Sequence, residues 1–213
     1  MKAARIKAGN DELLKPGAAF WSQATKEKVA LLPTPLAMVQ ELSPFLAISQ
    51  GHGAITALQV EAVHNGEMLA VRLSWAADKH DRVVDLNGFV DGAAVMFPTV
   101  TGASAITMGE AGKPVNAWYW KADQKVPYEV LAEGFRFVNR QKDNAGSDLK
   151  AAAVHADGRW QVVFRRSLGA RNGLVRFAPK QTSGIAFAVW SGAHAERSGR
   201  KAFSGDFVPL ELA

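Results

Sequence analysis

Hydrophobic and polar residues alternate along much of this chain in short stretches, a pattern typical of β-strands. Every second residue is apolar from Leu58 to Ala62, and again from Leu69 to Trp75. The dipeptide Asn65-Gly66 stands between the two stretches, and this pair favours the positive φ angles of a type I′ turn. The pattern therefore predicts a β-hairpin that turns at Asn65-Gly66.

The same signal occurs around Asp157-Gly158, after which Trp160, Val162 and Phe164 alternate with their neighbours. Other short stretches rich in β-branched or aromatic residues lie around residues 89–97, 116–121, 184–190 and 206–212. Many short strands separated by turns indicate an all-β fold. We predict a mainly antiparallel β-sandwich with a few short helices in the connections. One or two helices are expected in residues 127–140 or near residues 78–87.

Residues 31–53 break this pattern, because Pro33, Pro35 and Pro44 exclude a continuous helix and a central strand. The segment is apolar enough to lie on the protein's own core or on a partner chain. A length of 213 residues fits one domain. We therefore expect a single domain over residues 1–213, with an extended N-terminal arm at about residues 1–53.

The amino-acid composition limits the cofactors and partners that this chain can bind. The chain has no cysteine, which excludes disulfides, thiolate catalysis, iron–sulfur clusters held by this chain and covalent c-type haem. The net charge of +5 is modest and most basic residues are scattered, so nucleic-acid binding is not expected. No apolar run is long enough for a membrane span. Residues 1–9 carry charge but no apolar segment, so the protein either stays in the cytoplasm, has lost a leader, or is exported with a partner.

Common enzyme motifs are absent from the sequence. It contains no Walker loop, no GxGxxG and no GxSxG, and no two histidines four residues apart. Two glycine-flanked loops remain, at residues 105–110 and 195–205, and they carry Met108 and Lys201. From the residues alone, Met108 is best interpreted as a residue that fills a gap in the core, and Lys201 as a solvated side chain.

Several longer strings change that interpretation. They are FVDGAAVMFP (89–98), TMGE (107–110), WYWKA (118–122), DGRWQVVFRRSL (157–168) and IAFAVWSGAHAERSGRKAFSGDF (185–207). Together they resemble the haem b-binding γ subunits of ethylbenzene dehydrogenase-type molybdenum enzymes. These enzymes belong to the dimethyl sulfoxide reductase group, which also includes dimethyl sulfide dehydrogenase and the selenate and chlorate reductases. The resemblance covers roughly residues 33–212. The segments SPFLAISQGHG and AGSDLKA favour the ethylbenzene dehydrogenase type, and with it anaerobic hydrocarbon oxidation.

The resemblance implies a β-sandwich that holds one non-covalent haem b between a methionine and a lysine, here Met108 and Lys201. A thioether favours ferrous iron, and a lysine amine binds iron only after losing its proton. Arg197 and Arg200 either pair with the haem propionates or remain solvated. Trp118 and Trp120, on one face of a strand, are expected in the core rather than against the haem.

The resemblance also implies partners. The chain would be a non-catalytic electron carrier in a periplasmic complex, exported together with a signal-bearing α subunit. That α subunit would carry the molybdenum cofactor, a β subunit would carry iron–sulfur clusters, and an external acceptor such as a cytochrome would take the electrons. A haem with two protein ligands has no open position for a substrate, which argues against catalysis at the iron. The alternative is a sandwich that binds a carbohydrate or another ligand and has no redox role.

Overall fold

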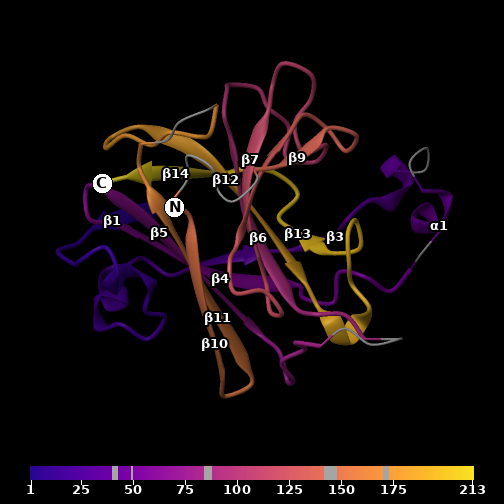
Figure 1. The fold of residues 1–213 in the computed structure, drawn as a ribbon, viewed down its shortest axis with the longest axis horizontal. Helices are drawn as coiled ribbons and strands as arrows, with labels where there is room; N and C mark the ends of the chain where they lie inside the picture. Colours follow the sequence, from indigo (N-terminus) through magenta and orange to yellow (C-terminus); the bar gives the residue numbers. More distant parts are fainter. Residues whose placement is uncertain (40–42, 49, 84–87, 142–147, 170–172) are drawn as a thin grey trace.

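One strand belongs to both sheets of this protein. β12 (Thr182–Trp190) pairs through residues 182–185 with β14 (Val208–Leu212) and through residues 186–190 with β6 (Gly92–Pro98). The computed structural model therefore contains two sheets, A and B, joined at β12 and packed as a sandwich (Figure 1). It describes residues 1–213 except 40–42, 49, 84–87, 142–147 and 170–172. The predicted all-β fold is confirmed.

Sheet A has the order β10-β11-β5-β4-β1-β14-β12, with β2 also paired to β4. The other strands of sheet A are β1 (Lys2–Arg5), β2 (Glu27–Ala30), β4 (Ala57–His64), β5 (Met68–Ala76), β10 (Lys150–Ala156) and β11 (Arg159–Ser167). All its pairs are antiparallel except those of β1, which runs parallel to both β4 and β14.

Sheet B has the order β9-β8-β7-β6-β12-β13-β3. Its other strands are β3 (Leu32–Pro33), β7 (Val115–Lys121), β8 (Tyr128–Ala132), β9 (Val138–Arg140) and β13 (Ala202–Phe203). The helices are short: η1 (Glu12–Leu14), η2 (Ala19–Gln23), η3 (Leu36–Val39), α1 (Pro44–Ala47) and η5 (Gly192–His194). None of the helices in the described part of the chain has the length and hydropathy needed to cross a bilayer.

Both predicted hairpins form, β4–β5 and β10–β11. At Asp157-Gly158 both residues have positive φ, 51° and 66°, as a type I′ turn requires. At the other turn only Gly66 does, with φ of 97°. The Asn65 side chain stabilises this turn instead, because its Oδ1 accepts the N–H groups of Glu67 and Met68 at 3.0 and 2.9 Å.

The prediction of a helix in residues 127–140 is wrong. Tyr128–Ala132 and Val138–Arg140 instead form the edge hairpin β8–β9. The buried Glu129 points to the opposite face from Tyr128 and Val130, so the true period is two. Residues 78–83 contain no helix either, and residues 84–87 lie outside the described residues.

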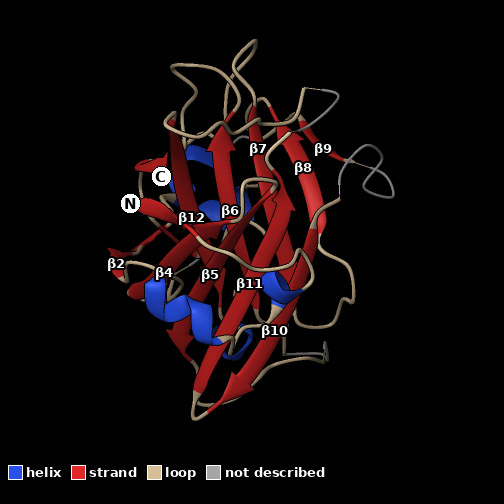
Figure 2. Cartoon of the chain, turned by 90° about the vertical axis from the view of Figure 1, so that its left-hand side faces the viewer, coloured by secondary structure: helices blue, strands red, loops and turns tan. Residues whose placement is uncertain are grey.

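The main core lies between the sheets and is filled from alternate positions of the long strands. Trp118 and Trp120 are both in it, as predicted, with 0% and 6% of their surface exposed. A second, smaller core lies on the outer side of sheet A, where Leu13 and Trp21 of the short helices cover the strands (Figure 2). The large side chains of β6, β7 and β12 mostly face the main core, which leaves smaller residues on the outer side of sheet B.

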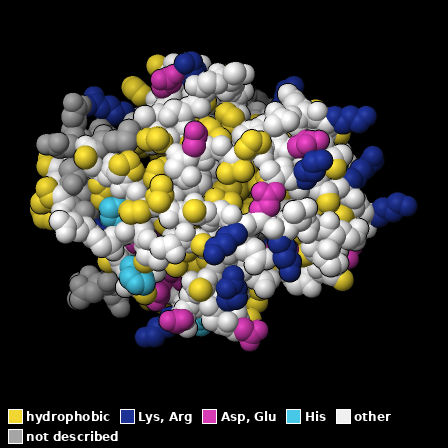
Figure 3. Space-filling model, turned by 180° about the vertical axis from the view of Figure 1, so that it is seen from behind, with side chains coloured by type: hydrophobic (Ala, Val, Ile, Leu, Met, Phe, Trp, Pro, Cys, Tyr) yellow, Lys and Arg dark blue, Asp and Glu magenta, His cyan; other side chains and the backbone are white. Residues whose placement is uncertain are grey.

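The first 53 residues, expected as an extended arm, divide into two parts. Residues 1–30 contribute β1 and β2 to sheet A. After Leu31 the chain crosses to sheet B, where β3 pairs with β13. We call residues 31–54 the arm. Phe45 and Ile48 of the arm are 86% and 76% exposed, and Figure 3 shows hydrophobic side chains at the surface on this half of the molecule.

A buried ion pair joins the two sheets through the core. Arg166 of β11 and Glu129 of β8 are both 0% exposed, with Nη1 and Oε1 2.7 Å apart. Arg166 also donates to Asn116 Oδ1 at 2.9 Å and to the carbonyl oxygen of Val175. Burial lowers the pKa of Arg166, and the Glu129 carboxylate opposes that shift. The guanidinium is thus a polar link across an otherwise apolar interior.

Replacing only one partner of this link should leave the other charge buried without compensation. We predict that Arg166→Met lowers the free energy of unfolding by about 3–5 kcal/mol. The double variant Arg166→Met/Glu129→Leu should recover most of that loss, because it removes both charges. Urea denaturation followed by circular dichroism measures both. A single variant within about 1 kcal/mol of the wild type would contradict this interpretation.

Asp91 allows a pH prediction. Its buried carboxylate accepts N–H groups from Asp81, Gly192 and the Trp160 indole at 2.8–2.9 Å, yet burial dominates and raises its pKa above 3.8. The folded state therefore holds this proton more tightly than the unfolded state does. The stability that the protonated form contributes is present below pH 3.8 and is lost as pH rises through the raised pKa.

We expect the difference in unfolding free energy between wild type and Asp91→Asn to change with pH, since the variant cannot titrate at this position. The wild type should lose stability relative to the variant as pH rises above 3.8. Denaturant titrations at several acidic pH values test this. A difference that does not vary with pH would show that the carboxyl group has an ordinary pKa.

Candidate functional site

The outer face of sheet B carries a row of small side chains. The register places Ala188 beside Ala94 and Ala94 beside Tyr119, across three neighbouring strands. Ala94, Ala188 and Trp190 form a buried cluster separate from the main core, against which Tyr119 and Phe203 pack. The face is therefore apolar, with a floor of methyl groups and taller aromatic side chains around it. We call it the alanine face.

Aromatic side chains continue across this face from β12 to the β8 edge. The Trp190 and Tyr119 ring centroids are 4.8 Å apart, and those of Tyr119 and Tyr128 are 5.9 Å apart. Gly92 makes room for this row, since a Cβ there would lie 3.2 Å from the Tyr119 ring. Burial raises the pKa of Tyr119, so its phenol stays protonated at neutral pH.

Lys201 lies at one end of the alanine face. It directly precedes β13, and its Nζ is 5.5 Å from the centroid of the Trp190 ring. Within the described residues, no carboxylate is within ion-pair distance of this amine. Burial lowers the pKa of Lys201 to about 8. The amine can thus lose its proton far more readily than a solvated lysine.

The backbone around Lys201 is held by the arm and by Trp190. The Lys201 carbonyl oxygen accepts two hydrogen bonds from Thr34, from the backbone N–H at 3.1 Å and the hydroxyl at 3.0 Å. The Trp190 indole donates to the carbonyl oxygen of Ser198 at 2.9 Å. The lysine loop, which we define as residues 191–201, is therefore fixed on two sides.

Glu196 is the most buried charged residue of the lysine loop, with 1% of its surface exposed. Its Oε1 accepts the N–H groups of Gly53 and Ala54 at 2.6 and 2.9 Å, and its Oε2 accepts that of Ser191 at 2.9 Å. Sequence reasoning gave this residue no role. The signals for it were its match within the ERSGRK string of the resemblance and its position as a single acid beside three basic residues, Arg197, Arg200 and Lys201.

The two arginines of the lysine loop bind protein groups in this structure. The guanidinium carbon of Arg197 lies 4.2 Å from the centroid of the Phe89 ring. Arg200 donates from Nη2 to the carbonyl oxygen of Gln50, at 2.9 Å, so it touches the arm. Both are close to Lys201 in sequence, and their contact with a ligand stays a prediction.

Met108 lies in the loop between β6 and β7, at the opposite end of these strands from Lys201. The residue has φ of 58° and its carbonyl oxygen accepts the N–H of Gly134 at 3.0 Å. Only glycine fits at position 109, since a Cβ there would lie 2.6 Å from the Ala132 carbonyl oxygen. The Thr107 hydroxyl is buried without a hydrogen-bond partner. The TMGE string thus specifies a tight, anchored loop.

The structure does not bring the four predicted site residues into one cluster. Lys201, Arg197 and Arg200 share the lysine loop, beside the Gly92 end of β6, and Met108 follows its Pro98 end. Six residues of strand separate these ends, or roughly 20 Å. The two potential ligands, Met108 and Lys201, therefore lie on loops at opposite ends of the same strands.

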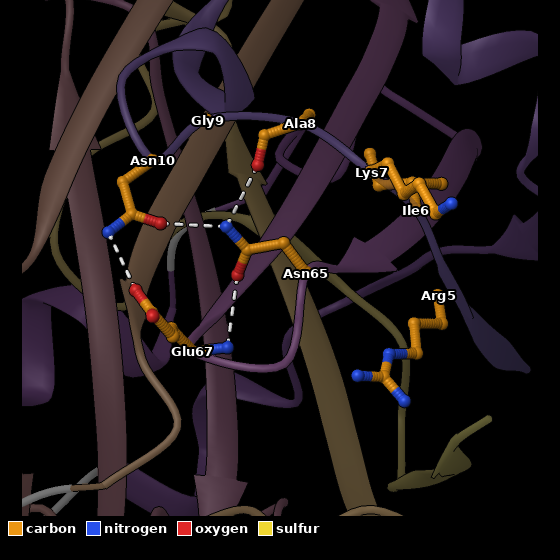
Figure 4. Close-up of a pocket in the computed structure, with 8 residues that line it drawn as sticks. All are labelled: Arg5, Ile6, Lys7, Ala8, Gly9, Asn10, Asn65 and Glu67. Atoms are coloured by element: carbon orange, nitrogen blue, oxygen red, sulfur yellow. Dashed lines mark hydrogen bonds between the residues drawn. The ribbon is translucent and has the colours of Figure 1, made fainter.

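A pocket of about 740 Å³ lies elsewhere, on sheet A, between residues 5–10 and the Asn65 turn (Figure 4). Its polar side chains bind one another. Asn65 Nδ2 donates to Ala8 O at 3.0 Å and to Asn10 Oδ1 at 2.7 Å, and Asn10 donates to Glu67 at 3.1 Å. None of the predicted site residues lines it. Among the described residues, no three His, Cys, Asp or Glu side chains gather as metal ligands.

Solved structures share the fold at low sequence identity. A family 9 carbohydrate-binding module from Caldicellulosiruptor kristjanssonii, in complex with glucose, has a TM-score of 0.52 and 9% identity. That match covers 100% of this chain and 95% of the module. A proposed carbohydrate-binding protein from Bacteroides uniformis has a TM-score of 0.55 and 7% identity, with 100% and 98% covered. At such identities only the fold is comparable.

Curated relatives are far more similar in sequence. The γ subunit of chlorate reductase from Ideonella dechloratans is 34% identical over 213 residues, covering 96% of this chain and 82% of the relative. A proposed respiratory nitrate reductase haem subunit from Haloferax mediterranei is 39% identical over 156 residues. The γ subunit of dimethylsulfide dehydrogenase from Rhodovulum sulfidophilum is 31% identical over 156 residues. The last two matches cover 71% of this chain but only 54% and 58% of the relatives.

A family model described as ethylbenzene dehydrogenase matches residues 18–149 and 135–202. These ranges include both loops of the candidate site, with Met108 in the first and Lys201 in the second. The match also spans nearly all of sheet B and most of sheet A. The chain therefore belongs to the ethylbenzene dehydrogenase family.

Proposed function

We propose that this protein is the haem b-binding γ subunit of a molybdenum oxidoreductase, and that it carries electrons without catalysing the reaction. The family and the names of its relatives support the subunit type. The observation that carries the haem site is the Lys201 amine. The residue is partly buried, its amine lies beside the Trp190 ring with no carboxylate partner among the described residues, and it is at the end of the alanine face away from the Met108 loop.

The residues present fit a haem. A porphyrin ring needs an apolar surface, which the alanine face supplies, and its iron takes protein side chains, a methionine thioether among them, as ligands. Met108 and Lys201 would be these donors. When bound, the haem supplies a one-electron couple between ferric and ferrous iron.

The chain's own residues prepare this site. Desolvation of Lys201 favours the neutral amine, whose lone pair is the donor. The thioether of Met108 is neutral without any proton loss and favours the ferrous state. Arg197 and Arg200 would pair with propionates at the rim of the face, where a planar guanidinium suits a carboxylate. With both ligands from the protein, no position is left for a substrate.

We further propose that the complex is of the ethylbenzene dehydrogenase type and periplasmic. A molybdopterin-containing α subunit would oxidise a hydrocarbon or a similar side chain, and iron–sulfur clusters of a β subunit would pass the electrons to this chain. A cytochrome or another external acceptor would receive them. The exposed Phe45 and Ile48 of the arm support a partner chain, because apolar side chains this exposed are typical of interfaces.

Purification of the full chain from cells supplied with haem tests the proposal. We expect one non-covalent haem b per chain, with a sharp, low-spin reduced spectrum. Co-purification with tagged α and β subunits should give a three-subunit complex. A colourless chain that binds glucose or cellulose oligomers would instead support the carbohydrate-binding alternative, which at present rests on the fold alone.

Replacing Met108 should open one side of the iron. We predict that Met108→Ala gives a five-coordinate, high-spin or haem-poor protein, measured by absorption and electron paramagnetic resonance. Met68→Ala is a matched control, because Met68 packs in the second core on sheet A. A Met108→Ala protein with normal haem content and an unchanged low-spin spectrum would show that Met108 is not a ligand.

Replacing Lys201 should shift the reduction potential in a direction set by the new ligand. We predict that Lys201→Met raises the potential, since a second thioether favours ferrous iron, and that Lys201→His lowers it. Potentiometric titration of the visible spectrum measures both. Lys150→Met controls for loss of a lysine, since Lys150 is exposed on β10 of sheet A, where it pairs with Asp11. An unchanged potential in both Lys201 variants would remove Lys201 from the iron.

A further inference from the structure

The arm and the lysine loop are joined at three points. Thr34 bonds the Lys201 carbonyl twice, Arg200 donates to the Gln50 carbonyl, and Glu196 receives the N–H groups of residues 53 and 54. Each point involves different residues of the arm and of the loop. The beginning of the arm, at Thr34, and its end, at residues 50–54, are therefore both bonded to the loop.

Glu196 contributes the strongest of these contacts. A buried carboxylate that accepts three N–H groups makes charge-assisted hydrogen bonds, which are stronger than neutral ones. Two of the donors belong to the arm, and the third, Ser191, is the first residue of the lysine loop. The Glu196 carboxylate thus binds the first residue of the lysine loop, and at the same point it binds the end of the arm.

The arm is folded so that its two ends meet at this point. A Cβ on Gly53, which has φ of 81°, would lie 2.7 Å from Pro33, so the backbone at residue 53 passes directly against β3. His52 shares a 2.7 Å hydrogen bond with the Thr34 carbonyl oxygen. Thr34, at the start of the arm, and Gly53, at its end, are therefore held next to each other. Both are bonded to the loop that presents Lys201.

We propose that Glu196 is a positioning residue, which fastens the arm across the lysine loop and so holds Lys201 in place for the iron. This inference rests on the proposed haem site. A lysine on a mobile loop would lose backbone as well as side-chain conformational entropy on ligation. Fixing the backbone of the lysine loop removes the backbone part of that cost before the haem is bound.

The test compares two buried glutamates of equal exposure. Glu196→Gln replaces one acceptor oxygen with an amide that faces N–H donors, so the contact with either the arm or Ser191 is lost. Glu61→Gln is the matched control. Glu61 is also 1% exposed and bonded, to Arg72 at 2.7 and 2.8 Å, but it lies on the outer side of sheet A. Both changes should weaken the fold, and only the first should affect the lysine ligand.

The measurements report whether Lys201 is bound to the iron, and they do not depend on catalytic turnover by the complex. In the haem-loaded protein, Glu196→Gln should bind carbon monoxide to the ferrous iron about tenfold faster or more, the factor expected for losing one charge-assisted hydrogen bond. Its ferric resonance spectrum should show part of the low-spin lysine signal replaced by a high-spin signal. The Glu61→Gln protein should match the wild type in both measurements.

Thr34→Val provides a second, milder variant that keeps the shape of the side chain. It removes the hydroxyl bond to the Lys201 carbonyl and leaves the backbone bond in place. We expect a smaller effect in the same direction, and this variant keeps the test decisive if Glu196→Gln does not fold.

The outcomes separate the two proposals. A wild-type chain that takes up no haem overturns the proposed function. A wild type with haem, together with Glu196→Gln and Thr34→Val proteins that keep its carbon monoxide rate and ferric spectrum, overturns the positioning role alone. Equal changes in Glu196→Gln and Glu61→Gln would also overturn it, because the effect would then come from general destabilisation.

Discussion

A β-strand has two faces, and this constraint organises the whole of sheet B. The tryptophans of β7 and the aromatic residues of β6 and β12 that face inward fill the space between the sheets. The alternate positions point outward, and about half of them in β6, β7 and β12 carry alanine or glycine: Gly92, Ala94, Ala117, Gly184, Ala186 and Ala188. A sheet built in this way packs tightly on one side and presents a shallow apolar surface on the other. The candidate site follows from that division rather than from a separate cavity in the fold.

The ends of the strands then determine which residues can reach this surface. The β6–β7 loop returns at one end with Met108, and the β12–β13 connection returns at the other with Lys201. Sequence distance does not decide this placement, because antiparallel neighbours bring their loops to fixed ends of the sheet. The buried Arg166–Glu129 pair supports this arrangement from the core side, since it links β11 of sheet A to β8, which lies beside β7, the strand that follows the Met108 loop.

Much of the fold was predictable from local signals. The hairpins at Asn65-Gly66 and Asp157-Gly158 followed from alternation and turn residues, and so did the core positions of Trp118 and Trp120. The edge hairpin β8–β9 was misread as helix because its alternation includes the buried Glu129, whose partner Arg166 is distant in sequence. For the same reason Glu196 was overlooked. Its bonds to Gly53 and Ala54 depend on how the arm crosses sheet B, and no local pattern encodes that path. Met108 and Lys201 were found only through the family resemblance, because a single methionine or lysine in a loop has no chemistry that spacing can reveal.

The position of β1 has a consequence for how the protein is made. This strand occupies the middle of sheet A, parallel to β4 on one side and to β14 on the other, with Lys2 beside Glu211. Residues 2–5 therefore cannot complete their hydrogen bonds until residues 208–212 have been synthesised. Contacts this distant in sequence slow folding and keep a strand edge open in the meantime. Until β14 arrives, sheet A remains incomplete, and the edges of β1 and β12 that β14 will cover stay open to other pairings.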